Sequence, residues 1–204
     1  MKRLLLLFLL TLVNLPAHAA TGTLLVFGDS LSAGLGLSSP DLGWVALLQR
    51  QLQGEGYGYQ VINASVSGET TAGGLTRLPR ALALHHPAIV ILELGANDGL
   101  RALPIAAMRS NLQQMVTLAQ GAGAQVLLLG MRMPPNYGPL YTQQFHAAFG
   151  QLAADLKLRS VPFLLQDIAL SAALMQPDGY HPNEQGQPAL LNNVWPALKP
   201  LLQK

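Results

Sequence analysis

Five short runs of nearly continuous apolar residues recur along the chain. A run of about five such residues, closed by a glycine or a polar residue, is typical of a strand that is covered on both faces of a sheet. The last run contains Pro162, which has no backbone N–H and therefore suits only an edge strand or the start of a strand. The predicted strands are 23–27, 59–63, 88–92, 125–129 and 161–165.

The segments between these runs carry apolar residues at the three- and four-residue spacing of a helix. Trp44, Leu48 and Leu52, for example, share one face of a helix. Alternating strands and helices predict an α/β fold, a three-layer α/β/α sandwich around a doubly wound parallel sheet of about five strands. The predicted helices are 43–53, 105–119, 142–158 and 187–202.

Residues 1–19 have a different pattern, which predicts a secretory signal peptide. A basic start at 2–3 precedes an apolar run over 4–13, and Ala-His-Ala at 17–19 places small residues where a signal peptidase reads them. The alternative, a transmembrane anchor, needs roughly 20 apolar residues, about twice the length of this run. Cleavage after this tripeptide would leave 20–204 as a single secreted domain without a stable membrane anchor, periplasmic in a Gram-negative host.

The amino-acid composition excludes several classes of protein and of functional site. Half of the 204 residues are hydrophobic and 11% are charged, which fits one globular domain and excludes a disordered chain. There is no cysteine, so disulfides, thiolate metal sites and cysteine nucleophiles are excluded. Two of the 12 Lys and Arg lie in the predicted signal peptide, so the rest balance the 10 Asp and Glu. A neutral domain without a basic run indicates no nucleic-acid partner.

Polar residues gather after the predicted strands, where ligands bind in open parallel sheets. Gly-Asp-Ser-Leu-Ser follows the first strand at 28–32, and Ser-Gly-Glu-Thr at 67–70 lies a short stretch after the second. Gly-Ala-Asn-Asp at 95–98 follows the third, and Asp-Gly-Tyr-His-Pro-Asn lies near the chain end at 178–183. Each segment alone is also typical of an ordinary turn or helix cap. All four in this order favour a catalytic site.

These segments contain the residue types of a serine hydrolase. A serine hydroxyl needs a base to take its proton, and histidine is the usual base. Ser30 is the predicted nucleophile, His181 the base, and Asp178, three residues before His181, the carboxylate that orients the imidazole. The predicted oxyanion hole consists of the Ser30 and Gly68 backbone N–H groups and the Asn97 side-chain amide. No metal site is predicted, because the pair of histidines at 85–86 has no carboxylate or cysteine at ligand spacing.

The same segments resemble the four signature blocks of the SGNH (GDSL) hydrolases, whose named residues fall on Ser30, Gly68, Asn97 and His181. A bacterial subgroup of that family, the multifunctional thioesterase I, protease I or lysophospholipase, is similar over 23–34, 61–70, 93–101 and 133–138. The resemblance implies a flavodoxin-like sheet and a monomeric enzyme that needs no cofactor. It also implies activity as an acyl-CoA thioesterase, arylesterase and lysophospholipase, on small-molecule acyl esters, thioesters and lysophospholipids.

The resemblance further places a substrate loop at 99–104 and an apolar wall near Met133 and Pro134. Leu100, Leu103, Met133 and Pro134 are therefore predicted to line a channel for an acyl chain. Ordinary core and loop packing would use the same residue types, since binding pockets are also mainly apolar. Each buried CH₂ group contributes roughly 0.8 kcal/mol, so even a shallow groove would favour longer chains.

The sequence leaves two alternative functions open. A carbohydrate O-acetyl esterase would use the same triad, and longer acyl chains would then be poor substrates. A noncatalytic acyl- or glycan-binding protein could share the scaffold, although binding alone does not require serine, histidine and aspartate together. A classical α/β-hydrolase is excluded, because its Gly-x-Ser-x-Gly pentapeptide is absent around Ser30.

Overall fold

The computed structural model describes residues 22–204, so the predicted signal peptide at 1–19 lies outside the described residues. Five strands form one sheet in the order β2-β1-β3-β4-β5, and every neighbouring pair is parallel. This is the flavodoxin-like strand order, so the predicted doubly wound parallel sheet is confirmed. The strands are β1 (Gly22–Gly28), β2 (Tyr59–Asn63), β3 (Ile89–Glu93), β4 (Gln125–Leu129) and β5 (Arg159–Val161).

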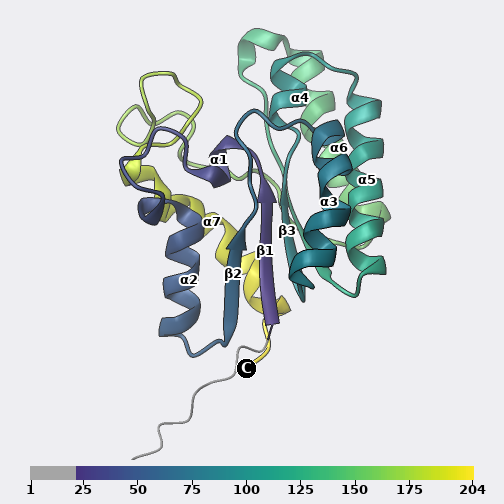
Figure 1. Cartoon of the computed structure of the whole chain (residues 1–204). Coiled ribbons are helices and arrows are strands. Elements are labelled where there is room, and N and C mark those ends of the chain that lie inside the picture. Colours follow the sequence, from purple (N-terminus) through teal and green to yellow (C-terminus); the bar gives the residue numbers. More distant parts are fainter. Residues whose placement is uncertain (1–21) are drawn as a thin grey trace, which may run out of the picture.

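Helices cover both faces of the sheet and produce three layers (Figure 1). Two helices, α2 and α7, pack together on one face, and α3, α5 and α6 pack on the other. Strand β3 is buried along its whole length because both of its faces are covered. The helices are α1 (Ser30–Ala33), α2 (Trp44–Gly54), α3 (Thr71–His85), α4 (Ala96–Leu100), α5 (Ile105–Gly121), α6 (Pro139–Asp155) and α7 (Gln187–Leu198).

The last strand differs from its prediction. It spans 159–161, so the expected strand over 161–165 is wrong in its extent. The Val161 carbonyl accepts from the Gly130 N–H at 2.8 Å, but the next residue, Pro162, has no N–H to continue the ladder. The chain then turns, and Leu164 donates to the Gly130 carbonyl at 2.9 Å. The remainder of the expected strand is therefore a loop.

Helix α3 has no counterpart among the predicted helices. Gly73, Gly74 and Pro79 weaken its sequence pattern, since glycine and proline are the poorest helix formers. Gly74 has a packing reason, because a Cβ at this position would lie 2.5 Å from a side-chain carbon of Leu94. The helix is stable because it buries its apolar face against the sheet, a tertiary contact that outweighs its local propensity.

The other long helices agree closely with their predictions. Helices α2 and α5 begin within one residue of the expected start. Helix α6 begins at Pro139, three residues before the expected position, because proline suits the first turn of a helix. Helix α7 ends at Leu198, and a 3-10 turn over 199–201 completes the segment that was expected to be one helix.

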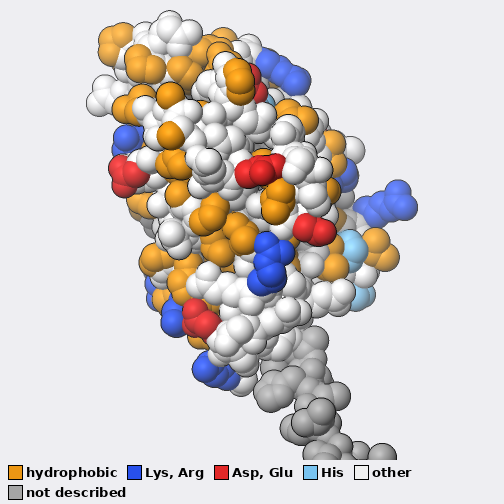
Figure 2. Space-filling view, turned by 90° about the vertical axis from the view of Figure 1, so that its left-hand side faces the viewer, with side chains coloured by type: hydrophobic (Ala, Val, Ile, Leu, Met, Phe, Trp, Pro, Cys, Tyr) orange, Lys and Arg blue, Asp and Glu red, His pale blue; other side chains and the backbone are white. Residues whose placement is uncertain are grey.

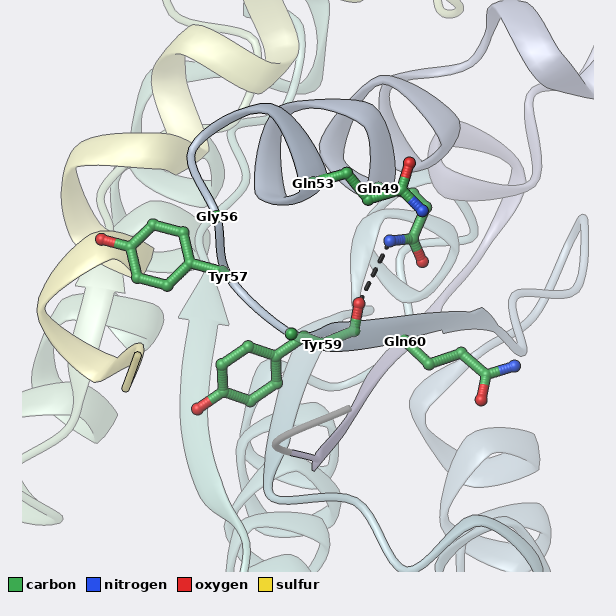
Figure 3. Close-up of a pocket in the computed structure, with 7 residues that line it drawn as sticks. Gln49, Gln53, Gly56, Tyr57, Tyr59 and Gln60 are labelled. Atoms are coloured by element: carbon green, nitrogen blue, oxygen red, sulfur yellow. Dashed lines mark hydrogen bonds between the residues drawn. The ribbon is translucent and has the colours of Figure 1, made fainter. Parts of the chain in front are cut away.

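A side chain covers the free edge of strand β2. Gln49 of α2 donates from Nε2 to the Tyr59 carbonyl at 3.1 Å (Figure 3). Its Oε1 accepts from the Val61 N–H at 2.7 Å. An unpaired edge strand can template aggregation, and Gln49 satisfies the backbone groups that would do so. A hollow of about 510 Å³ beside this side chain, lined by glutamine, tyrosine and glycine residues, lies at the amino-terminal end of β2.

The strand order reverses between β1 and β3. The chain leaves β1 toward β2 on one side and leaves β3 toward β4 on the other, so the two connections diverge and open a crevice at the carboxyl ends. Ser30 follows β1 directly, and Asn97 lies just after β3. The fold therefore places the predicted nucleophile and a predicted oxyanion donor at the position where such sheets bind ligands.

Candidate active site

The turn that presents Ser30 is built by close packing at the end of β1. Ser30 is the first residue of the short helix α1, and Asp29 caps this helix by accepting from the Leu31 N–H at 3.0 Å. Gly28 makes room for a neighbouring carboxyl group, because a Cβ there would lie 2.5 Å from Glu93 Oε2. The backbone of the turn is thereby fixed, and Ser30 is nearly buried at the cavity described below.

Ser30, His181 and Asp178 form a continuous chain of contacts. The Ser30 Oγ lies 2.8 Å from His181 Nε2, and His181 Nδ1 lies 2.7 Å from Asp178 Oδ2. A carboxylate beside Nδ1 favours the tautomer that carries the proton on Nδ1, and in this tautomer Nε2 can accept a proton from the serine hydroxyl. The structure thus brings together all three residues of the predicted triad in the required order.

The loop that carries His181 is anchored on both sides of the histidine. The Gln176 N–H donates to the His181 carbonyl at 2.7 Å, and its side-chain amide donates to the carbonyls of Leu35 at 2.7 Å and Pro182 at 3.1 Å. Gln187, at the start of α7, also donates to the Pro182 carbonyl at 3.2 Å. These bonds fix the position of the histidine relative to the Ser30 turn, which lies beside Leu35.

The side chain of Asp178 is 43% exposed, and its surroundings favour the charged carboxylate. Partial burial alone would raise the pKa of Asp178, but hydrogen bonds from the His181 ring and from the Tyr180 and His181 backbone N–H groups lower it below the ordinary value. Both N–H groups donate to Oδ1, at 2.9 and 3.0 Å. Oδ2 therefore remains available to the imidazole.

Gly68 lies in a loop that several contacts tie to its neighbours. Its φ of +78° is in the left-handed region that favours glycine. The Val66 N–H donates to the Gly28 carbonyl at 3.0 Å, and Arg101 donates to the Gly68 carbonyl at 3.0 Å. Arg77 of α3 pairs with Glu69 at 3.0 Å. The loop is thereby held against the Ser30 turn, with Gly68 at the wall of the same cavity.

Asn97 lies at the other side of the Ser30 turn, in α4. Its Nδ2 donates to Asp29 Oδ2 and to the Glu69 carbonyl, both at 3.0 Å. These two acceptors occupy both hydrogens of the amide, so an oxyanion would have to share or replace one of them. The three predicted oxyanion donors, Ser30, Gly68 and Asn97, all border one cavity.

A fully buried carboxyl group lies beneath the nucleophile turn. Glu93 Oε2 accepts from the Asp29 N–H at 3.2 Å and from the Ser32 hydroxyl at 2.7 Å, while Oε1 has no partner among the described residues. Burial, reinforced by the Asp29 carboxylate, raises the pKa of Glu93 well above its usual range. Burial also raises the pKa of Asp29 to about 6, against the lowering effect of the Leu31 N–H. Burial therefore favours the neutral form of Glu93.

The cavity at Ser30 has a volume of about 540 Å³ and is mostly apolar. Of the residues predicted to form an acyl channel, Leu100, Met133 and Pro134 line it. Leu103 is not among the lining residues and is instead exposed in the loop after α4. The cavity is large enough to hold an extended chain in addition to the reacting ester.

Sequence reasoning missed part of this site. Several apolar lining residues were not predicted, namely Leu31, Leu35, Met131, Phe163, Leu165, Ala169, Leu170 and Met175. Those of the segment 163–170 were missed because part of it was interpreted as a strand. Glu93 was assigned no role, although an acidic residue next to the apolar run 88–92 was an available signal.

Residues 22–204 contain neither a cluster of metal-ligating side chains nor a membrane-spanning helix. No group of three or more His, Asp or Glu side chains in this part is arranged to hold a metal ion. No helix within it is both long enough and apolar enough to cross a bilayer.

Comparisons with known proteins agree on the family. Residues 26–189 match the "GDSL-like Lipase/Acylhydrolase family". The chain is 54% identical to "Esterase TesA" of Pseudomonas aeruginosa over 202 residues, which cover 99% of this chain and 100% of the relative. It is 40% identical to "Thioesterase 1/protease 1/lysophospholipase L1" of Escherichia coli K12 over 184 residues, which cover 90% of this chain and 86% of the relative.

A solved structure gives the same result. The structure described as "Crystal Structure of TesA" superposes with a TM-score of 0.86 at 54% identity, and the match covers 88% of this chain and 99% of that one. The family match spans most of the described residues and includes the Ser30, Gly68, Asn97 and His181 segments. The resemblance inferred from these four segments is therefore confirmed, and the chain belongs to the GDSL-like (SGNH) family of lipases and acylhydrolases.

Proposed function

We propose that the protein hydrolyses acyl esters and thioesters of lipids through a Ser30–His181–Asp178 triad and a covalent acyl-enzyme. The observation that carries this proposal is the pair of short contacts on His181, 2.8 Å to the Ser30 Oγ and 2.7 Å to Asp178 Oδ2. A histidine between a hydroxyl and a carboxylate is the arrangement that activates a serine nucleophile.

The reaction would proceed in two transfers. Ser30 Oγ attacks the acyl carbonyl carbon while His181 Nε2 takes the serine proton. The tetrahedral intermediate then expels the thiol or alcohol, which His181 protonates, and the acyl group remains on Ser30. Water attacks this acyl-enzyme with His181 again as the base, the serine oxygen recovers the proton, and the carboxylic acid leaves.

The oxyanion of each intermediate would be held by the Ser30 and Gly68 N–H groups and by the Asn97 amide. Before substrate binds, the Asn97 amide donates to Asp29 and to the Glu69 carbonyl. An oxyanion would therefore compete with one of these acceptors for its hydrogen. The two existing bonds hold the Asn97 amide in place before substrate binds, so that only the partner of one hydrogen would change when the oxyanion forms.

The proposed substrates have an acyl chain longer than acetyl. Leu100, Met133 and Pro134 line a cavity that is mostly apolar, and a buried chain would gain roughly 0.8 kcal/mol for each CH₂ group. Relatives bear the names esterase and thioesterase/lysophospholipase. An acetyl ester of a carbohydrate would leave most of the cavity unfilled, so the O-acetyl esterase alternative is disfavoured.

The proposed location is outside the cytoplasm. Residues 1–19 have the three-part pattern of a secretory signal peptide, and the relatives above come from Gram-negative bacteria. Removal of this segment would release residues 20–204 into the periplasm as a single monomeric domain that needs no cofactor. Sequencing the amino terminus of the exported protein would test the proposed cleavage after Ala19.

The proposed activity is tested by measuring kcat/KM on p-nitrophenyl esters from two to sixteen carbons, for the wild type and Ser30→Ala. We expect a maximum at six or more carbons and a loss of about 10⁴-fold or more in the variant, because the acyl-enzyme cannot form. Ser32→Ala is the matched control, since it removes a hydroxyl from the same turn, and its loss should be much smaller. A maximum at two carbons would favour the deacetylase, and no hydrolysis at any length would favour a binding protein.

A further inference from the structure

The exposed apolar side chains are concentrated at one end of the molecule. Nine large hydrophobic residues of the described chain are exposed, and two of these, Leu84 and Leu118, lie on the outer helices α3 and α5. The other seven lie between the carboxyl end of a strand and the first turn of the next long helix, namely Leu35, Leu42, Val66, Leu103, Leu140, Leu170 and Tyr180. Hydrophobic side chains are visible at the same upper end in Figure 2. Leu35, Leu170 and Tyr180 also line the active-site cavity, so the apolar surface continues into the site.

One part of this surface, which we call the docking rim, consists of residues 99–107 and 131–141. Its two segments are tied together, because the Tyr137 hydroxyl donates to the Leu100 carbonyl at 2.9 Å and the Tyr141 hydroxyl donates to the Gly99 carbonyl at 3.1 Å. The two segments are therefore joined beside the mouth of the cavity.

The docking rim combines apolar exposure with a positive charge. Leu103 and Leu140 are exposed at its surface. Its only charged residues are Arg101 and Arg132, and the two segments contain no aspartate or glutamate. Arg101 donates to the Gly68 carbonyl at 3.0 Å, and the Arg132 guanidinium lies 5.2 Å from the centre of the Phe163 ring. Both cations are thus held at the mouth of the site.

We propose that the docking rim binds the surface of a phospholipid bilayer with anionic headgroups. Exposed leucines enter the boundary between headgroups and acyl chains, and arginines attract the phosphates. The occupant is argued from the charge of the rim, from its apolar side chains, and from its continuity with a cavity suited to acyl chains. The proposal rests on the proposed function only in that the cavity beside the rim is taken as the reacting site. Docking would let an acyl lipid pass from the bilayer into the cavity without crossing water.

Flotation with vesicles of phosphatidylglycerol or phosphatidylcholine tests this proposal on the protein purified after export. The variant is Leu140→Glu, and its control is Leu84→Glu, because both leucines are 67% exposed and both variants carry the same charge. We expect the wild type and the control to bind phosphatidylglycerol vesicles, and Leu140→Glu to bind about tenfold or more weakly. We also expect the wild type to bind phosphatidylcholine vesicles more weakly than phosphatidylglycerol vesicles. This preference for phosphatidylglycerol should disappear at about 0.5 M salt, because salt screens the attraction between arginine and phosphate.

The result is separated from the proposed activity by hydrolysis of p-nitrophenyl butyrate in solution. Neither leucine lines the cavity, so both variants should hydrolyse this soluble ester at the wild-type rate. Equal loss of vesicle binding in the two variants, or no binding by the wild type, would overturn the docking proposal. If the proteins still hydrolyse the soluble ester, the proposed triad is unaffected by that result. Absent hydrolysis of the soluble ester by the wild type would instead contradict the proposed function.

Discussion

Two carboxyl groups near the Ser30 turn, those of Asp178 and Glu93, have different environments. Asp178 is half-exposed and accepts from the His181 ring at 2.7 Å. Its partial burial would raise its pKa, but that bond and the bonds from backbone N–H groups together lower it. Glu93 is fully buried and supports the turn through Asp29 and Ser32, and burial raises its pKa. The environment of Asp178 therefore favours its charged form, whereas that of Glu93 favours its neutral form.

The difference separates two roles that residue type alone does not distinguish. A charged carboxylate beside an imidazole stabilises the imidazolium that forms during the reaction. A neutral carboxylic acid in the core can accept hydrogen bonds that fix a backbone turn, without placing a second buried charge beside Asp29. Under the proposed mechanism, Asp178 would orient and stabilise the His181 imidazole, and Glu93 would hold the turn that carries Ser30.

The largest expected effect is on activity, when each of the two carboxyl groups is replaced by the corresponding amide. Asp178→Asn should lower kcat/KM by about 10³- to 10⁴-fold, because an amide does not hold the imidazole proton on Nδ1. Glu93→Gln should stay within about tenfold of the wild type, because its amide oxygen can still accept both hydrogen bonds. Steady-state kinetics on one p-nitrophenyl ester checks both variants. Equal losses would contradict the separation of roles.

A smaller effect is expected on stability when the Glu93 side chain is removed. Glu93→Ala should lower the free energy of unfolding by about 3 kcal/mol, because it leaves a cavity and two buried donors without a partner. At about pH 4, where Glu93 is protonated in the folded chain and largely so in the unfolded chain, Glu93→Gln fills the same space and should change it by less than about 1 kcal/mol. Urea unfolding measures both values. Similar values for alanine and glutamine would show that Oε2 does not hold the turn.

The smallest effect is a difference in how pH changes stability. Because the pKa of Glu93 is raised in the folded protein, the unfolded chain loses this proton at a lower pH than the folded chain does. The wild type should therefore lose stability relative to Glu93→Gln as pH rises above about 4.5. The lowered pKa of Asp178 has the opposite sign. Its contribution is present above about pH 4 and disappears as pH falls through the lowered value, and exposure limits it to less than about 1 kcal/mol.

Melting temperatures of the wild type and both amide variants between about pH 3 and 8 would resolve these opposite trends. The Glu93→Gln difference should grow in favour of the variant with rising pH. The Asp178→Asn difference should grow in favour of the wild type over the acidic part of the range. Parallel curves for the three proteins would mean that neither carboxyl group is perturbed as described.

The sequence predicted most of the sheet because apolar runs report burial on both faces directly. Strands β1, β2, β3 and β4 lie within one residue of the predicted runs. Strand β5 and helix α3 were harder to predict. Pro162 ends a strand that begins earlier than the predicted run, and close packing requires a glycine, a poor helix former, at position 74. Local propensity does not contain these tertiary contacts.

The gathering of polar residues at one cavity was predictable for a related reason. The carboxyl ends of parallel strands converge, so polar residues after the strands predicted that Ser30, Gly68 and Asn97 lie close together. The cavity wall formed by 163–170 was not predictable, because it depends on how a loop folds back over the sheet. The role of Glu93 depends on complete burial, which a sequence pattern does not establish.

If Ser30 is the nucleophile, a p-nitrophenyl alkylphosphonate should label its side chain covalently. The phosphonate is attacked as the acyl carbonyl would be, and the adduct does not turn over. Peptide mass spectrometry should place a single adduct on Ser30, with no label after Ser30→Ala. An adduct on Ser32 or elsewhere, or undiminished labelling of the variant, would contradict the account.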